Sequence, residues 1–588
     1  MSLLPPHEER KRFAFLRIVV ATLIVFFVLH LLDLQVVNAG NINKVSLEHR
    51  QKTRTIEAVR GSIFDKDGKV LARSIYRYDV NVAPVNVGPI SREVNGSTIT
   101  LSVDQIAGQL ASILEMDKAV LLKKFVGTGQ YANLKKKVDA SVYSQINSLN
   151  IPWIYFDSHL SRVYPNGAVA GNILGFITAD GATKAGLESK MDPCLAGVNG
   201  KETYEQGVDG IRIPDSAIVA KQAKNGGNLK LTIDTNLQYF AQQVLETAVR
   251  NERADYGTAV VVEVKTGKLL VAAEAPSVDP NNPGAVIERD RQAKVFNFTY
   301  EPGSTMKMIT AATLLDLGLA NPESKVVAPY KLKMSWGNTW IYDSHNHPTM
   351  NLTLTGVLRD SSNTGIVQLG AKAPREQRFN YMKKFGLGSK TSLNMGGEAS
   401  GILGNYKTWD LLTDKNSMFG QGVSVTPIQS AMMYQAIGNG GVRLNPILVD
   451  GCEADINNFK NAEVKPGVQV ISKGTAAQTL SMLERVVEAG PIGRYGAIPG
   501  YRIGAKTGTA QIRDENTGKY AGPYAISYFG VAPIDDPQYV VAVTAFKSRT
   551  VGSSLGVAKP FKRIMQQVLR AYRVPPSTTK TSDLPLNW

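Results

Sequence analysis

The sequence predicts an α+β protein with a single membrane-spanning helix, a mixed, β-rich region and a larger domain of helices packed on an antiparallel sheet. Three observations lead to this fold class. A long apolar run lies near the N-terminus, and short alternating strand patterns punctuated by glycine follow it from about residue 40 to about residue 225. From about residue 228, amphipathic helix patterns mix with strand patterns. Such helices bury their apolar stripe by packing on a sheet.

Composition is that of an ordinary folded protein and limits the partners. The chain has 588 residues, of which 43% are hydrophobic and 20% charged. Its formal net charge of +16 fits nucleic acid, anionic membrane or cell-envelope polymer as a partner, but no nucleic-acid-binding pattern accompanies it. The two cysteines, Cys194 and Cys452, exclude zinc ribbons, iron–sulfur clusters and a disulfide framework. Because they fall in different expected domains, we expect no disulfide between them.

The N-terminal apolar run predicts a membrane anchor. Four basic residues precede an apolar stretch over 18–32, and Asp33 follows it. With its flanks, residues 13–37, the segment exceeds the roughly 20 residues that span a bilayer. The basic residues place residues 1–12 in the cytoplasm and the chain after about residue 38 outside it, where nucleic acid is not a partner. A cleavable signal peptide is the alternative, because residues 37–39 resemble a cleavage site, but the run is long for a signal core.

The part beyond the anchor divides into two domains and a tail. We expect a β-rich domain over residues 38–225, with a helix over 103–114 and a hairpin that turns at Asp67-Gly68. A second domain covers 228–574, and the Pro-, Ser- and Thr-rich residues 575–588 are expected to be a flexible tail. In the second domain the expected elements are strand 229–233, helix 236–252, hairpin strands 258–264 and 268–273, helices 305–318 and 425–438, strands 502–506, 525–531 and 539–546, and a closing helix over 557–572.

A Ser-x-x-Lys motif, Ser304 to Lys307, opens one of the apolar helices. The preceding Pro302-Gly303 makes a turn, so Ser304 falls in the first helical turn and Lys307 shares its face. The helix N-terminus favours an anionic oxygen, and a lysine among apolar neighbours loses proton affinity, which makes it a base near neutral pH. Alone, the motif equally fits a first-turn serine beside a solvent-reaching lysine. A second copy, Ser577 to Lys580, lies in the polar tail with nothing to bury its lysine.

A Ser-x-Asn motif is the second candidate. It occurs four times, so spacing does not choose among the copies. The copy with Ser361 and Asn363 is favoured by context, because it lies in a predicted loop between two short helical patterns. A loop in that position projects polar groups into a cleft.

A Lys-Thr-Gly motif is the third candidate, and it occurs twice. Residues 265–267 form the turn of the predicted hairpin, whereas Lys506 follows a strand-like run. On a strand Lys506 and Gly508 share one side, so the glycine would leave a flat floor for a ligand backbone. The hydroxyl groups of Thr507 and Thr509 suit the binding of a carboxylate.

The three motifs, in this order and within about 200 residues, resemble the penicillin-binding protein and serine β-lactamase family. Other stretches resemble class B penicillin-binding proteins, namely Arg60–Ala72 and Arg162–Phe176 in the pedestal domain and Leu231–Asp234 and Phe419–Pro427 in the transpeptidase domain. The resemblance covers about residues 10–575. The sequence has neither a glycosyltransferase-like domain nor a C-terminal repeat domain. In this the chain is similar to the division-type (septal) members of class B.

The resemblance implies a role for each motif residue. Ser304 would be the nucleophile, Lys307 its general base, Ser361 a proton relay to the leaving amine supported by Lys506, Asn363 a hydrogen-bonding partner of the substrate peptide, and Thr507, Gly508 and Thr509 the substrate-binding strand. Backbone N–H groups of Ser304 and Thr509 would form the oxyanion hole. The implied substrate is the D-Ala-D-Ala end of a peptidoglycan stem peptide, which forms an acyl-enzyme that an amine attacks. No cofactor or metal is implied.

The absence of a Glu-x-x-Leu-Asn segment predicts that the acyl-enzyme hydrolyses slowly, so a β-lactam would inhibit the protein. A D,D-carboxypeptidase and a non-catalytic envelope scaffold or β-lactam sensor remain alternatives. The intact motif set argues against the scaffold. The sequence does not decide whether the third stem residue is diaminopimelate or lysine. Family resemblance implies lipid-linked precursors, a membrane-embedded glycan polymerase and other division proteins as partners.

Asp343, His345 and His347 have the alternating spacing of metal ligands on a strand. Asn346 and Pro348 indicate a polar loop instead, and the family mechanism needs no metal. We therefore expect no metal site there.

Overall fold

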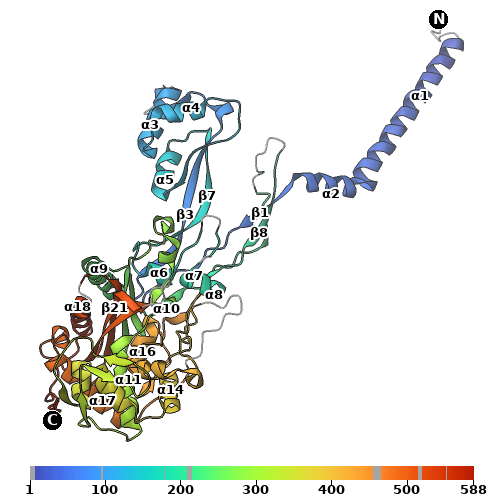
Figure 1. The fold of residues 1–588 in the computed structure, drawn as a ribbon. Coiled ribbons are helices and arrows are strands. Elements are labelled where there is room, and N and C mark those ends of the chain that lie inside the picture. Colours follow the sequence, from blue (N-terminus) through green and yellow to red (C-terminus); the bar gives the residue numbers. More distant parts are fainter. Residues whose placement is uncertain are drawn as a thin grey trace. The chain divides into compact units, whose positions relative to one another are not determined.

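The computed structural model describes residues 7–94, 97–178, 181–183, 185–207, 213, 215–453, 465–513, 520–550 and 553–588 (Figure 1). The chain divides into two compact units. Unit 1 consists of Met1–Val59 and Gly197–Gly226, and unit 2 of Arg60–Ala196 and Gly227–Trp588. Each unit is described by itself.

Unit 1 contains the apolar helix and a small sheet. Its elements are α1 (His7–Leu32), the π-helix η1 (Asp33–Val37), α2 (Ala39–Arg50) and the antiparallel strands β1 (Gln51–Ile56), β8 (Gly200–Glu205) and β9 (Ile218–Lys221), in the order β1-β8-β9. Among the described residues, Arg10–Val37 is the one helical segment long and apolar enough to cross a membrane, with a mean hydropathy of 2.6. The predicted apolar helix is therefore confirmed.

The first part of unit 2 is a mixed sheet with a helical cap. The sheet order is β18-β10-β2-β3-β6, and β7 also pairs with β3. The elements are β2 (Ile63–Phe64), β3 (Val70–Val82), β4 (Ile90–Val94), β5 (Ser97–Leu101), α3 (Val103–Leu114), α4 (Lys118–Phe125), β6 (Ala132–Val138), α5 (Ala140–Ser148), β7 (Ile154–Val163), α6 (Gly171–Leu174), α7 (Gly186–Lys190), α8 (Asp192–Leu195), β10 (Leu229–Leu231) and β18 (Val449–Cys452). The predicted helix over 103–114 is confirmed, and Ser102 and Gln105 form its capping box.

The second part of unit 2 is built on a five-stranded antiparallel sheet, in the order β12-β11-β22-β21-β20. α9 packs on β11 and β12, and α18 packs beside it on β21 and β22 (Figure 1). The sheet and its main helices are α9 (Thr235–Glu252), β11 (Tyr256–Glu263), β12 (Leu269–Ala275), α11 (Lys307–Asp316), α16 (Pro427–Gly438), α17 (Lys473–Ala489), β20 (Gly504–Arg513), β21 (Tyr520–Ala532), β22 (Tyr539–Ser548) and α18 (Leu555–Ala571). The predicted antiparallel sheet flanked by helices is confirmed.

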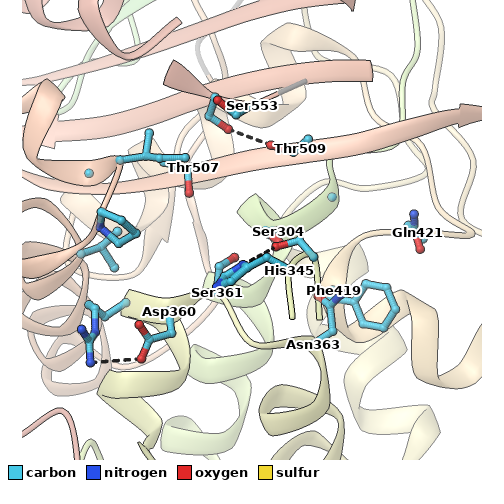
Figure 2. A pocket seen from close by; sticks show the side chains of 18 residues that line it. Ser304, His345, Asp360, Ser361, Asn363, Phe419, Gln421, Thr507, Thr509 and Ser553 are labelled. Carbon is cyan, nitrogen blue, oxygen red and sulfur yellow. Dashed lines mark hydrogen bonds and ion pairs between the residues drawn. The ribbon is translucent and has the colours of Figure 1, made fainter. Parts of the chain in front are cut away.

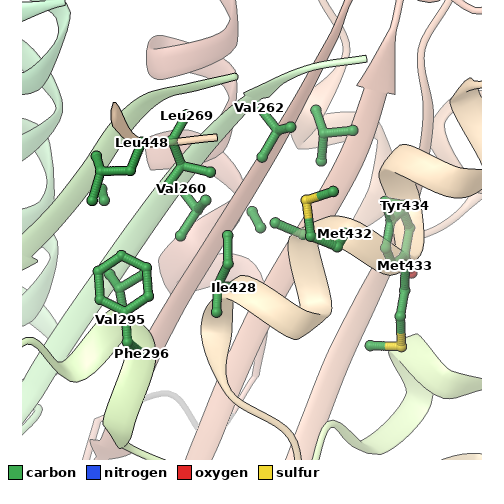
Figure 3. Packing of buried hydrophobic residues seen from close by; sticks show 14 of the residues in the cluster. Val260, Val262, Leu269, Val295, Phe296, Ile428, Met432, Met433, Tyr434 and Leu448 are labelled. Atoms are coloured by element: carbon green, nitrogen blue, oxygen red, sulfur yellow. The ribbon is translucent and has the colours of Figure 1, made fainter. Parts of the chain in front are cut away.

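The two faces of this sheet are buried by different helices. α16 is apolar almost all round and wholly buried, and Figure 3 shows its Ile428 and Met432 packed near Val260 and Val262 of β11. On the other face the amphipathic α18 packs with α9 over a separate core cluster. β20, which carries the Lys-Thr-Gly motif, is the edge strand of this sheet, pairs with β21 and packs against α17 and η5 (Gly303–Met306).

Shorter elements complete unit 2. They are α10 (Lys294–Asn297), β13 (Lys325–Ala328), β14 (Lys331–Lys333), β15 (Trp340–Tyr342), β16 (Met350–Thr353), α12 (Leu354–Asp360), α13 (Asn363–Gly370), α14 (Arg375–Lys384), α15 (Leu411–Asn416), β17 (Val442–Arg443) and β19 (Val468–Gln469), with short 3-10 turns of which η5 (Gly303–Met306) matters for the site. β13 pairs with β16, and β14 with β15.

The expectation of unpaired cysteines is wrong, because Cys194 and Cys452 form a disulfide. Cys194 lies in α8 and Cys452 at the end of β18, so the two are far apart in sequence but close in space. Gly227 donates a backbone hydrogen bond to the Cys194 carbonyl, and Leu229, two residues on, pairs with Cys452. β18 thus joins a sheet made mostly by the earlier part of the chain, and a division into sequential domains did not anticipate this.

The expectation of a flexible tail is also wrong. Residues 575–588 lie against the rest of unit 2. The Ser577 hydroxyl donates to Asp535 at 2.7 Å, and the Trp588 N–H donates to the Asn351 carbonyl at 3.2 Å. The polar composition that suggested disorder supplies these hydrogen bonds.

Candidate active site

The three sequence motifs meet at one pocket of about 480 Å³ in unit 2. Figure 2 shows Ser304 and Ser361 close together, with Thr507 and Thr509 on the strand above them. The motif residues that line the pocket are Ser304, Ser361, Asn363, Thr507 and Thr509, whereas Lys307, Lys506 and Gly508 do not line it. Lys307 and Lys506 are fully buried.

The Ser-x-x-Lys motif starts α11 through a tight turn. Residues Gly303–Met306 form the 3-10 turn η5, and α11 begins at Lys307. Because a 3-10 turn has three residues per turn, the side chains of Ser304 and Lys307 are aligned. The Lys307 Nζ lies 3.0 Å from the Ser304 Oγ. The predicted pairing is present, although the first turn is 3-10 rather than α-helical.

Lys307 and Lys506 both contact Ser361. Lys307 Nζ donates to the carbonyl of Ser361 and lies 3.2 Å from its Oγ, and Lys506 Nζ lies 3.0 Å from the same Oγ. Burial lowers the pKa of Lys307 to about 7, and the negative charge of Asp343 partly opposes this. Burial, together with the nearby charge of Lys307, also holds the pKa of Lys506 well below its ordinary value. A lysine of this kind takes a proton from a hydroxyl near neutral pH.

This pKa predicts the pH dependence of acylation. If neutral Lys307 accepts the Ser304 proton, then protonation of Lys307 below about pH 7 removes the base. We expect the second-order rate constant for acylation by a β-lactam to fall about tenfold per pH unit below the pKa of Lys307 and to level off above that pKa. Stopped-flow acylation across the pH range measures this, and a flat profile would contradict the role of Lys307.

Ser361 lies in the predicted loop between two short helices. α12 ends at Asp360, Ser361 has a left-handed backbone with φ of 57°, and α13 begins at Asn363. The side chain of Ser362 accepts from the N–H of Gly365 and caps α13. This turn points Ser361 toward the two lysines.

The sequence analysis considered Asp343 only as a metal ligand, whereas the structure places it as a support of the Ser361 loop. Its Oδ1 accepts from the backbone N–H groups of Asn363 and Thr364, and its Oδ2 accepts from Ser362 Oγ at 2.7 Å and contacts His347 Nε2 at 3.0 Å. An anion at the N-terminus of α13 satisfies unpaired donors and complements the helix dipole. No spacing rule links residues 20 positions apart, so only the fold shows this role.

A metal at Asp343, His345 and His347 was not expected. Among the described residues, the structure contains no group of three His, Cys, Asp or Glu side chains that could hold a metal ion. His345 lines the pocket and lies 3.3 Å from the Ser344 hydroxyl, whereas His347 is committed to Asp343.

We expect Asp343→Ala to reduce acylation about tenfold or more and to lower the melting temperature. The change leaves buried donors of α13 unsatisfied, at about 1–3 kcal/mol. Asp343→Asn keeps an acceptor but removes the charge that raises the pKa of Lys307, so its acid limb should shift to lower pH. His347→Ala, which removes a single contact of Asp343, is the matched control. Unchanged acylation in Asp343→Ala would contradict a positioning role.

The Lys-Thr-Gly strand packs directly on the serine turn. A Cβ on Gly508 would lie 2.9 Å from the Thr305 side chain and 3.0 Å from the Pro302 carbonyl. The expectation that Gly508 leaves a floor for a ligand is therefore wrong, because the protein's own η5 turn fills that space. Glycine is needed there so that β20 and η5 approach closely.

Ser554 is a site residue that the sequence did not reveal. Its hydroxyl donates to the Gly508 carbonyl at 2.7 Å and lies 3.1 Å from the Thr509 Oγ1. Together with Thr507 and Thr509, it gives the pocket a wall of hydroxyl groups along β20.

A serine that starts a helix, a buried lysine of lowered pKa beside it and a second serine–lysine pair define an active-site-serine acyltransferase. The sequence matches the penicillin-binding protein transpeptidase domain over residues 257–566 and the penicillin-binding protein dimerisation domain over residues 55–231. The chain belongs to the penicillin-binding protein transpeptidase family.

Three relatives illustrate the similarity. Penicillin-binding protein PbpB of Mycolicibacterium smegmatis is 32% identical over 95% of this chain and 89% of its own length. Peptidoglycan D,D-transpeptidase FtsI of Escherichia coli is 30% identical over 94% of this chain and 90% of its own. The crystal structure of penicillin-binding protein 3 from Mycobacterium tuberculosis complexed with aztreonam has a TM-score of 0.67 and 26% identity, covering 91% of this chain and all of that one.

Proposed function

We propose that this protein is a serine D,D-transpeptidase that cross-links peptidoglycan stem peptides during septal cell-wall synthesis. The observation that carries the proposal is the buried Lys307 amine 3.0 Å from the Ser304 hydroxyl and in contact with Ser361. The similarity to class B penicillin-binding proteins over most of the chain supports the substrate class.

In the first half-reaction, Ser304 Oγ attacks the carbonyl carbon between the two D-Ala residues while Lys307 accepts its proton. Backbone N–H groups of Ser304 and Thr509 stabilise the oxyanion, each contributing about 3 kcal/mol. The C–N bond breaks, and the departing D-Ala amine receives a proton through Ser361, supported by Lys506. An acyl-enzyme remains on Ser304.

The other pocket residues hold the substrate. Asn363 donates its amide to the Tyr342 carbonyl at 2.8 Å, which fixes its orientation beside the substrate's peptide. Thr507 and Thr509 bind the terminal carboxylate of the donor. In the second half-reaction an amine from a neighbouring strand enters where D-Ala left, and the steps run in reverse. No cofactor or metal takes part.

A β-lactam would acylate Ser304 in the same way, and the resulting acyl-enzyme would hydrolyse slowly. The aztreonam complex of the tuberculosis relative supports this expectation. A D,D-carboxypeptidase, which uses water as acceptor, and a non-catalytic scaffold or sensor are the alternatives.

We further propose that residues 13–37 anchor the chain in the cytoplasmic membrane with residues 1–12 inside the cell. The basic residues in the first turns of α1 precede its apolar part, and this favours a cytoplasmic N-terminus. Residues 38–225 then form a pedestal and 228–574 the catalytic domain, both extracytoplasmic. A membrane-embedded glycan polymerase and other division proteins are the proposed protein partners.

Labelling the full chain with a fluorescent penicillin, followed by mass mapping of the modified residue, tests the proposal. We expect a stable adduct on Ser304. A rapidly fading adduct would favour a hydrolytic enzyme, and no adduct would favour the scaffold. Incubation with a D-Ala-D-Ala stem peptide and an amine acceptor then separates cross-linking from carboxypeptidase activity by the product formed.

A further inference from the structure

Residues 582–588, which we call the end strap, lie along β16. β16 is followed by α12, and α12 ends directly before Ser361. The strap pairs antiparallel with β16, since Thr353 N–H donates to the Leu586 carbonyl at 3.1 Å and Trp588 N–H to the Asn351 carbonyl at 3.2 Å. β16 pairs with β13 on its other side. The strap therefore serves as a third strand of that small sheet.

The strap also fixes the start of α12. Thr353 is the N-cap of α12, and its hydroxyl accepts from the N–H of Gly356 and donates to the Pro585 carbonyl at 2.6 Å. The Leu586 carbonyl lies so close to α12 that a Cβ on Gly356 would come within 1.9 Å of it. Only glycine at position 356 lets the strap reach the helix.

α12 connects this contact to the active site. It is seven residues long and ends at Asp360, directly before Ser361. Leu584 of the strap packs against the core cluster that includes Val357 and Leu358 of α12. Because so short a helix moves as a rigid body, its start and its end shift together.

The beginning of the end strap is hydrogen-bonded to α17, the helix that packs against α12. Ser582 N–H donates to Glu484 Oε2 at 2.9 Å, and Arg485 donates to the Ser582 carbonyl at 3.2 Å, both from α17. Glu484 is buried and also holds Arg502, which precedes β20, through two hydrogen bonds of 2.7 and 2.6 Å. The end strap thus contacts α12, which carries the Ser361 loop, and Glu484, which binds Arg502 just before the strand that carries Lys506.

We propose that the end strap is a positioning segment for acylation, which holds α12 so that Ser361 stays within reach of Lys307 and Lys506. This inference rests on the proposed role of Ser361. A displacement of about 1 Å in a reacting group costs on the order of a hundredfold in rate, so a strap that sets this geometry affects the chemical step itself. A strap that only stabilised the fold would change the amount of active protein instead.

Two variants of the full chain test this. The first ends before Ser582, and the second is Gly356→Ala, which forces the Leu586 carbonyl away while alanine favours the helix. Lys580→Ala, an exposed position just before the strap, is the matched control. Rapid-mixing acylation with a chromogenic β-lactam gives the burst amplitude, the acylation rate constant and the binding constant separately.

We expect both variants to lower the acylation rate constant about tenfold or more, with binding nearly unchanged. A synthetic peptide of residues 582–588, added in trans, should restore the rate constant of the truncated protein. If the burst amplitude falls but the rate constant of the active fraction does not, the proposal is overturned. If the truncated chain does not fold, Gly356→Ala decides alone, and an unchanged rate constant there overturns it. Lack of acylation in the unmodified protein would instead contradict the proposed function.

Discussion

We expect Ser304→Ala to abolish acylation by β-lactams and transfer of stem peptides. The alanine removes the one atom that forms the acyl bond in the proposed mechanism. We expect a loss of at least about 10⁴-fold, to the detection limit, with an unchanged melting temperature. Fluorescent penicillin labelling and the rate of cross-linked product formation measure it.

Ser577→Ala is the matched control, because Ser577 and Lys580 form the second Ser-x-x-Lys motif. The structure commits the Ser577 hydroxyl to Asp535 and to the N–H of Arg502, away from any lysine amine. This variant should therefore be labelled like the unmodified protein. An adduct that persists in Ser304→Ala would refute the assignment of the nucleophile.

The local pattern of the catalytic residues could be predicted from the sequence. Periodicity and turn residues placed Ser304 at a helix start, Ser361 between two helices and Lys506 on a strand, and the structure shows each of them there. Spacing of three or two residues within one element is a local property, so it can be read without a fold.

The residues that hold the motifs together could not be predicted in this way. Asp343, Ser554 and the end strap act across long sequence separations, and Gly508 serves the packing of β20 on η5. The disulfide was missed for the same reason, because β18 returns to a sheet begun nearly four hundred residues earlier. Composition also misled at residues 575–588, where Ser and Thr bind the surface and do not mark disorder.

We expect Lys307→Met to separate the effect on catalysis from the effect on stability. Methionine nearly matches the length of the lysine side chain but carries no amine, so Ser304 keeps its place and loses its base. Loss of a general base costs about 10²–10⁴-fold in rate. We expect the acylation rate constant to fall by this amount, while β-lactam binding before acylation changes little.

The same change should not weaken the fold. Lys307 is 0% exposed, and its pKa of about 7 means that burial penalises the charged form. In the unfolded chain the lysine is protonated up to its ordinary pKa, so below that pH folding must either release a proton or bury a charge, and stability falls as the pH is lowered. Methionine removes this cost. Lys307→Met should therefore melt at the same or a higher temperature than the unmodified protein, and its melting temperature should depend less on pH between about 7 and 10. A variant that is both inactive and markedly less stable would indicate that Lys307 holds the pocket together through Ser361 and is not primarily the base.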